Sequence, residues 1–168
     1  MVAGGEATDM QPVPLPTEDA ETLRDLFRGN QEAVEFIFAW KHYVHLIDDL
    51  IDGEIDGRQV GECVCELQAR ACYLFTIPFF LRHMSALRAQ VILCTNAYAD
   101  SVRWEKSSVP WQRNLADMLR HSGADMVRLV ASICAGDNPD GYRHLRRISA
   151  DIHSVNYHEH RTPDGQPD

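Results

Sequence analysis

Apolar residues recur every three or four positions through most of this chain, and no segment alternates apolar and polar residues as a β-strand does. This period predicts helices at residues 17–28, 31–52, 62–75, 84–106, 111–135 and 142–157, with a further helical turn that starts at Pro78. Glycines after two of these segments, Gly53 and Gly136, stand where a helix C-terminal cap is expected. We therefore expect an all-α fold, a single-domain bundle of about five or six helices.

The two ends of the chain differ in composition from the rest. Residues 1–16 carry two adjacent glycines and three prolines, which indicates a disordered or extended arm. Residues 17–160 then form the helical domain, and residues 161–168 form a flexible tail. A chain of 168 residues is long enough for one domain with a hydrophobic core.

Charge and hydropathy narrow the choice of partners. The formal net charge of -9 does not favour binding to nucleic acid, although a local basic patch such as Arg143, Arg146 and Arg147 would allow it. There is no apolar run of about 18 residues or more, so we expect no contact with a membrane interior. The N-terminus lacks a signal-peptide pattern, which predicts a cytoplasmic protein. An oligomer is compatible with this composition.

Three carboxylates, Asp48, Asp49 and Asp52, close the predicted helix 31–52. Each faces the negative end of the helix dipole, which costs about 0.3–1 kcal/mol, so a positive group is expected nearby. The three share an arc of roughly 120° with Lys41, His42 and His45. Oxygen ligands of this kind suit Mg²⁺ or Mn²⁺. The alternatives are a transition-metal site that uses the histidines and a plain solvated helix face.

A second polar set lies on the predicted helix 84–106. Asn96 and Asp100 are one turn apart, and Arg103 lies on the same side. The first two could supply oxygens to a second metal ion, and Arg103 could bind a phosphate through two hydrogen bonds. An Asp100–Arg103 pair within one surface helix is the alternative. Glu105 projects to the opposite side of this helix, so we leave it out of the predicted site.

Further candidates follow on the helix 111–135 and on the first long helix. Asp125 stands just before a very apolar run, where it is either a surface residue or a member of an internal polar cluster with a catalytic role, and Arg128 follows one turn later as a second candidate phosphate ligand. His45 could accept a proton near neutral pH, although a packed structural histidine is an equal alternative.

Two motifs together resemble the all-α isoprenoid synthases, in particular the squalene and phytoene synthase branch. The stretch from Tyr43 to Gly53 is similar to the first Asp-rich motif of that branch, and Asn96–Asp100 is similar to the start of the second. The resemblance implies an isoprenoid-synthase-like fold in which both motifs face one cavity and bind Mg²⁺ ions that hold a diphosphate. Asp48, Asp49 and Asp52 would be ligands of the first site, and Asn96 and Asp100 of the second.

The chain also departs from that family. Arg103 and Trp104 stand where the second motif continues with acidic residues, and the chain is much shorter than the usual isoprenoid synthase. The resemblance therefore supports ionisation of a diphosphate better than it supports a long prenyl substrate.

Residues 77–83 and 45–52 look similar to short helical proteins encoded by bacteriophages and prophages. That resemblance implies the cytoplasm of a bacterial host and a role in hypermodification of phage DNA. A modified base that bears a diphosphate would be the substrate, and an amine would capture the ionised carbon.

These observations predict a Mg²⁺-dependent enzyme that transfers or eliminates part of a diphosphate-bearing small molecule or modified DNA base, with hydrolysis as the next choice. One alternative is an all-α nucleotide pyrophosphohydrolase, because Glu32–Glu35 and Asp49–Asp52 imitate its motif order. On one unbroken helix those pairs would be about 25 Å apart, too far to share a metal ion. The other alternative is a non-enzymatic helical adaptor or inhibitor with an acidic binding face.

Overall fold

The computed structural model describes residues 17–55, 57–120 and 122–136. Within these residues the chain forms seven helices and no strand, which confirms the all-α prediction. The helices are α1 (Thr17–Leu26), α2 (Gln31–Asp52), α3 (Val60–Thr76), α4 (Pro78–Arg82), α5 (Met84–Glu105), α6 (Pro110–Arg120) and α7 (Gly123–Ala135). The predicted arm 1–16, the predicted helix 142–157 with its arginines 143, 146 and 147, and the tail 161–168 lie outside the described residues.

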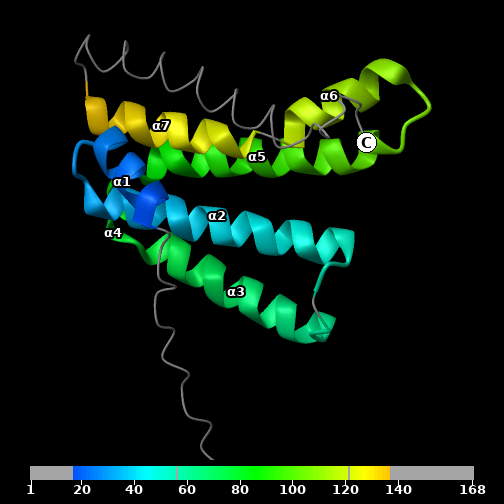
Figure 1. Ribbon diagram of the computed structural model, residues 1–168, viewed down its shortest axis with the longest axis horizontal. Helices are drawn as coiled ribbons and strands as arrows, with labels where there is room; N and C mark the ends of the chain where they lie inside the picture. Colours follow the sequence, from blue (N-terminus) through cyan, green and yellow to red (C-terminus); the bar gives the residue numbers. More distant parts are fainter. Residues whose placement is uncertain (1–16, 56, 121, 137–168) are drawn as a thin grey trace, which may run out of the picture.

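The long helices alternate in direction (Figure 1). α2 runs away from the end that holds α1 and α4, and α3 returns beside it. α5 runs in the direction of α2, and α6 and α7 then return beside α5. The closest packing is between α5 and α6 and between α2 and α3, and α7 packs on both α2 and α5. The short helices α1 and α4 close the end at which α2 begins. The result is an up-and-down bundle whose fourth member is divided in two.

Local signals fix both ends of α2. The side chain of Asn30 accepts a hydrogen bond from the backbone N–H of Ala33 at 3.1 Å, as a helix N-cap does. Gly53 ends the helix in the left-handed region, with φ 78° and ψ 15°, and its N–H donates to the carbonyl of Asp49. The predicted range 31–52 is therefore confirmed at both ends, and the three aspartates do occupy its last turns.

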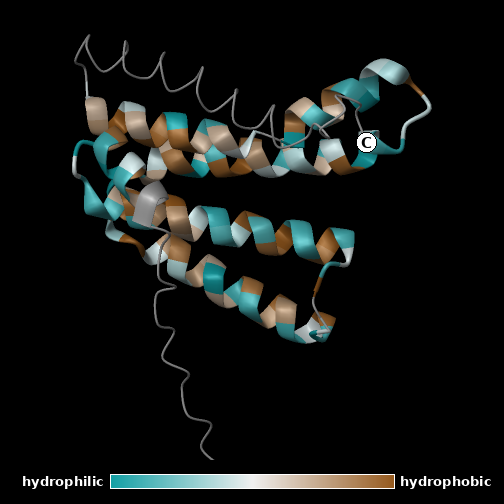
Figure 2. Cartoon of the chain, in the orientation of Figure 1, coloured by the Kyte–Doolittle hydropathy of each residue, from teal (hydrophilic) through white to brown (hydrophobic). Residues whose placement is uncertain are grey.

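The hydrophobic core lies toward the end where α2 begins. Phe36 of α2 stacks against Phe79 and Phe80 of α4, with ring centroids 5.9 Å apart in each pair. The fully buried large side chains also include Phe27, Val34, Leu74, Leu87, Met126 and Val130. In Figure 2 hydrophobic and hydrophilic residues alternate along α2 and α3, as expected of helices with one buried face. The opposite end of the bundle is more polar, and the aspartates lie there.

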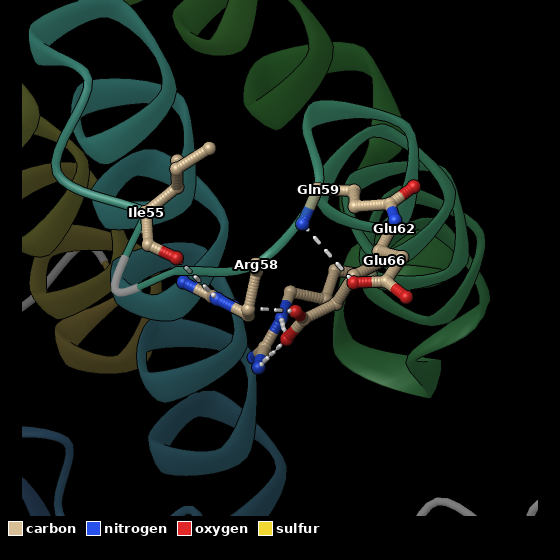
Figure 3. A network of polar contacts seen from close by, with 6 residues as sticks. Ile55, Arg58, Gln59, Glu62 and Glu66 are labelled. Atoms are coloured by element: carbon tan, nitrogen blue, oxygen red, sulfur yellow. Dashed lines mark hydrogen bonds and ion pairs between the residues drawn. The ribbon is translucent and has the colours of Figure 1, made fainter.

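The loop that follows these aspartates is tied to α3 by an ion pair (Figure 3). Arg58 contacts Glu66 at 3.0 Å and also donates to the carbonyl of Ile55 at 3.2 Å. Arg70, one turn beyond Glu66, donates to the same carboxylate at 2.8 Å. The partly exposed Arg58–Glu66 pair anchors the connection between α2 and α3 after Asp52, and Arg70 holds the Glu66 carboxylate from within α3.

The prediction of one helix over residues 111–135 is wrong, because α6 ends at Arg120 and α7 begins at Gly123. Serine and glycine are poor helix formers, so an interruption of the helix at Ser122 and Gly123 costs little free energy. The Ser122 carbonyl accepts the backbone N–H of Asp125 at 3.0 Å at the start of α7, and it also accepts a hydrogen bond from the Cys94 thiol at 3.4 Å. This break places Arg120 at the C-terminal end of α6.

Replacing the fully buried Leu74 by alanine should lower the free energy of unfolding by about 2–5 kcal/mol, because it leaves a cavity in the core. Leu93→Ala is the matched control, since Leu93 is 61% exposed and its loss should cost about 0.5 kcal/mol or less. Urea denaturation monitored by circular dichroism measures both. Equal losses in the two variants would contradict the placement of the core.

Candidate functional site

The aspartates at the end of α2 find their positive partner on α6. Asp52 Oδ2 lies 3.9 Å from Nη1 of Arg120. Asp48, one turn earlier, accepts a hydrogen bond from the hydroxyl of Tyr98 on α5. The unfavourable end of the α2 dipole is thus offset by a guanidinium and a phenol from neighbouring helices.

Arg120 joins three helices at this end of the bundle. Its Nη2 donates to Glu105 Oε2 of α5 at 3.1 Å. Its guanidinium carbon lies 5.9 Å from the centroid of the Tyr98 ring, within the range of a cation–π contact. We call Asp48, Asp52, Tyr98, Glu105 and Arg120 the Arg120 cluster.

Two pockets flank Arg120, and it lines both. One, of about 180 Å³, which we call the Arg113 pocket, is lined by Ser101, Glu105, Arg113, Ala116, Asp117 and Arg120. The other, of about 90 Å³, which we call the Trp40 pocket, is lined by Trp40, Tyr43, Val44, Ile47, Cys94, Thr95, Tyr98, Arg120, Ser122 and Gly123. The first has charged walls and the second has mainly apolar walls, so the two could hold chemically different parts of a ligand.

Tyr98 is held in its protonated form. Burial raises the pKa of its hydroxyl, and the hydrogen bond to the Asp48 carboxylate together with the charge of that carboxylate raises it further. The backbone next to this ring is also fixed, because the buried Ser101 hydroxyl donates to the Tyr98 carbonyl at 2.7 Å. Tyr98 is therefore a hydrogen-bond donor that positions Asp48, and it does not act as a base near neutral pH.

The second predicted motif lies on another side of α5. Tyr98 points to Asp48, and Asn96 and Asp100 are each two residues from Tyr98, which is about 200° around a helix. Asn96 is exposed, and Asp100 pairs with Arg103 at 2.8 Å within α5. The structure therefore does not bring Asn96 and Asp100 together with Asp48. Their metal-binding role stays a prediction.

The remaining predicted residues are dispersed. Asp125 pairs with Arg128 one turn later on α7, and His45 is exposed on α2. Asp49 is half-buried. Among the described residues, no group of three or more His, Cys, Asp or Glu side chains is placed to hold a metal ion by itself.

Sequence reasoning missed Glu105, Arg120 and the hydroxyl of Tyr98. Glu105 projects away from Asn96 and Asp100, and that same direction brings it to Arg120. A usable signal existed in the spacing of Tyr98, Ser101 and Glu105, which are three and four residues apart and form one polar stripe on α5. The sequence of α5 itself does not indicate that the stripe with Tyr98, and not the stripe with Asn96 and Asp100, faces α2.

Comparisons of the chain with protein-family models, with curated proteins and with solved structures found no match. The resemblance to squalene and phytoene synthases and the resemblance to phage proteins therefore stay predictions. None of the helices in the described part of the chain has the length and hydrophobicity needed to cross a membrane.

Replacing Arg120 by glutamine should lower the free energy of unfolding by about 1 kcal/mol, because Asp52 and Glu105 then lose their shared counter-charge. Arg103→Gln breaks only one exposed pair within a helix and should cost about 0.5 kcal/mol or less. Denaturant unfolding at low ionic strength measures the difference. A larger loss for Arg103→Gln would contradict the assigned role of Arg120.

His42 should make stability depend on pH. Burial lowers its pKa from 6.5, with smaller contributions from the positive charges of Arg70 and Lys41. The neutral imidazole is favoured in the folded state, so this stabilisation is complete above pH 6.5 and is lost as the pH falls through the lower folded pKa. His42→Gln should flatten the acid side of the stability profile, measured by denaturant unfolding. An acid side that keeps the slope of the parent in His42→Gln would contradict the assignment.

Proposed function

We propose that this chain is an enzyme that acts on a diphosphate-bearing small molecule at the Arg120 cluster. The observation that carries the proposal is the meeting of Asp52 from α2 and Glu105 from α5 on the guanidinium of Arg120, at the wall of a charged pocket. Polar groups that converge from several helices on one pocket are the usual starting point for an active-site assignment.

The charges around this pocket are mixed. Four carboxylates, those of Asp48, Asp52, Glu105 and Asp117, accompany the two guanidiniums of Arg113 and Arg120. Guanidiniums match phosphate oxygens in shape and charge. The excess of carboxylates would repel a bare diphosphate but not one that arrives with a divalent cation. The pocket therefore favours a ligand that carries both signs of charge.

The donor set fits Mg²⁺ brought in by the substrate. In phosphate chemistry Mg²⁺ usually takes only one or two protein carboxylates and completes its shell with phosphate oxygens and water. Asp48 and Asp52 lie one turn apart on α2 and would be those carboxylates, so a set of three protein ligands is not required. The metal would neutralise the leaving diphosphate.

The side chains of the cluster have distinct tasks in this proposal. Arg120 and Arg113 hold the phosphate oxygens and support the negative charge that grows on the leaving group. Tyr98 keeps Asp48 in place through its hydrogen bond. The reaction is transfer or elimination by ionisation of the diphosphate. Arg120 and Arg113 take the role that the sequence suggested for Arg103 and Arg128.

The pyrophosphohydrolase alternative gains no support from α2. The helix runs without interruption from Gln31 to Asp52, so its two acidic pairs lie at opposite ends. Glu32 pairs with Arg82 and Glu35 accepts a hydrogen bond from Tyr73, so both belong to contacts near the core.

An adaptor is the second candidate, and exposed apolar side chains on α5 and α6 favour it. Trp111 is 58% exposed, Met118 70% and Leu93 61%. Trp111 meets Trp104 edge to face, with ring centroids 5.7 Å apart, which brings the two helices' apolar side chains together. Exposed apolar surface of this kind is typical of protein-binding sites.

Thermal unfolding with Mg²⁺, with pyrophosphate and with both tests the proposal. We expect stabilisation only with both, by roughly 2.7 kcal/mol, or about 5–10 °C in Tm, when the ligand exceeds its Kd about 100-fold. Asp52→Asn and Arg120→Gln should abolish the shift. Asp100→Asn should retain it, because Asp100 pairs with Arg103 away from the cluster.

Two outcomes would contradict this proposal. No shift in the parent protein would leave the adaptor as the better account. A Tm shift that is lost in Asp100→Asn but retained in Arg120→Gln would indicate that the ligand binds at the two Asp-rich motifs and not at the Arg120 cluster.

A further inference from the structure

The largest apolar side chains of α6 lie away from the helix on which it packs. Among the described helices, α5 alone packs closely on α6, and Ala116 is the residue that α6 buries. Met118 is two residues from Ala116, about 200° around the helix, and Trp111 shares the side of Met118 because seven residues separate them. Both side chains are largely exposed. An amphipathic surface helix normally buries its apolar stripe, so this side of α6 calls for a covering element that the described residues do not supply.

Trp104 and Leu115 extend this side of α6 into one apolar surface. Trp104 of α5 meets Trp111 edge to face, and Leu115 is half-buried one turn after Trp111. We call Trp104, Trp111, Leu115 and Met118 the Trp111 surface. Tryptophan and methionine are enriched at protein–protein interfaces, where lysine and the acidic residues are depleted.

Charge restricts the partners that fit this surface. The chain has a formal net charge of -9, so two copies repel each other unless they meet where charges are absent or paired. The Trp111 surface is uncharged, and Arg103 at its border is paired with Asp100. A strongly basic partner would be drawn to the acidic faces of the chain and not to this neutral one. A second copy of the chain brings an equally neutral surface.

The apolar residues of α6 are complementary to themselves when a second copy runs antiparallel. With a twofold axis beside Asn114 and Leu115, each Trp111 lies opposite the partner's Met118. A sulfur atom next to an aromatic ring makes a favourable contact. The spacing of the two residues along α6 therefore suits a symmetric contact.

The charges of α6 are also complementary in this arrangement. Arg113 and Asp117 lie one turn apart on one flank of α6. Antiparallel packing places that flank against the same flank of the partner, so Arg113 lies opposite the partner's Asp117. The Arg113 guanidinium donates to the Ser107 carbonyl at 2.7 Å and retains further N–H donors. Opposite charges therefore meet at the rim of the contact.

The size of the surface indicates a weak dimer. α6 has 11 residues, which makes it about 16 Å long. A contact limited to α6 and Trp104 is smaller than the roughly 800 Å² per partner of a standard stable interface. We therefore expect a Kd in the micromolar range.

We propose that the Trp111 surface is the interface of a weak twofold-symmetric dimer of this chain, in which α6 packs antiparallel on the partner's α6. Trp111 and Met118 fill the centre of the interface, and Arg113 and Asp117 pair across its rim. Arg113 also lines the charged pocket, so the dimer places that pocket beside the interface. The inference does not rest on the diphosphate proposal, because it concerns the outer side of α6.

Sedimentation velocity over a range of protein concentrations tests this proposal, without metal ion or pyrophosphate in the samples. The average mass should rise from the 19.1 kDa of one chain toward twice that value as the concentration increases. Circular dichroism of each variant checks that the helices are retained.

Substitutions on two helices locate the interface. Met118→Glu places a charge at the centre of the interface and should raise the Kd about tenfold or more. Trp111→Gln removes the largest apolar contact and should act in the same direction. Val64→Glu is the matched control and should leave the Kd unchanged, because Val64 is 50% exposed on α3, which does not pack closely on α6.

A charge exchange tests the antiparallel arrangement. Arg113→Glu places two carboxylates opposite each other across the rim and should raise the Kd roughly threefold. Adding Asp117→Arg to that variant exchanges the two charges and should restore the Kd of the parent.

Three results would overturn the inference. A parent mass that stays at 19.1 kDa throughout would leave the Trp111 surface to another protein or to residues 137–168 of the same chain. A dimer that is lost in Val64→Glu and kept in Met118→Glu would place the interface on α3. A dimer that is weakened by Arg113→Glu and not restored by the exchange would rule out the antiparallel arrangement. The Tm shift with Mg²⁺ and pyrophosphate is measured separately, so either proposal can fail alone.

Discussion

The ion pairs of Arg120 with Asp52 and Glu105 determine how the polar end of this bundle is built. Asp48 and Asp52 occupy the last turns of α2, where the helix dipole repels them, so their charge must be offset from outside the helix. Arg120 offsets it from α6 and also binds α5. Because one guanidinium serves three helices, the two pockets on either side of it share a wall.

The break between α6 and α7 makes this arrangement possible. A continuous helix would carry the apolar positions of α7 in register with those of α6, and the interruption at Ser122 resets that register. Arg120 is then the last residue of α6, beside the carbonyl that Cys94 binds. The position of Arg120 at the polar end therefore depends on the weak helix formers Ser122 and Gly123 as well as on its ion pairs.

Much of the fold could be predicted from local sequence. Asn30 and Gly53 identify the two ends of α2, and the helical period identifies the other long helices. The candidate site could not be predicted as fully, because it depends on the rotation of α5 about its axis. The stripe with Asn96 and Asp100 and the stripe with Tyr98 and Glu105 are equally polar in sequence, and only packing against α2 and α6 selects the second.

A double-mutant cycle between Asp52 and Arg120 tests the central claim most directly. The unfolding free energies of Asp52→Asn, Arg120→Gln and the double variant give the coupling between the two side chains. We expect a favourable coupling of about 0.5–1 kcal/mol for this pair, and a coupling near zero for Asp52 with Asp100. Zero coupling between Asp52 and Arg120, together with measurable coupling between Asp52 and Asp100, would contradict the account.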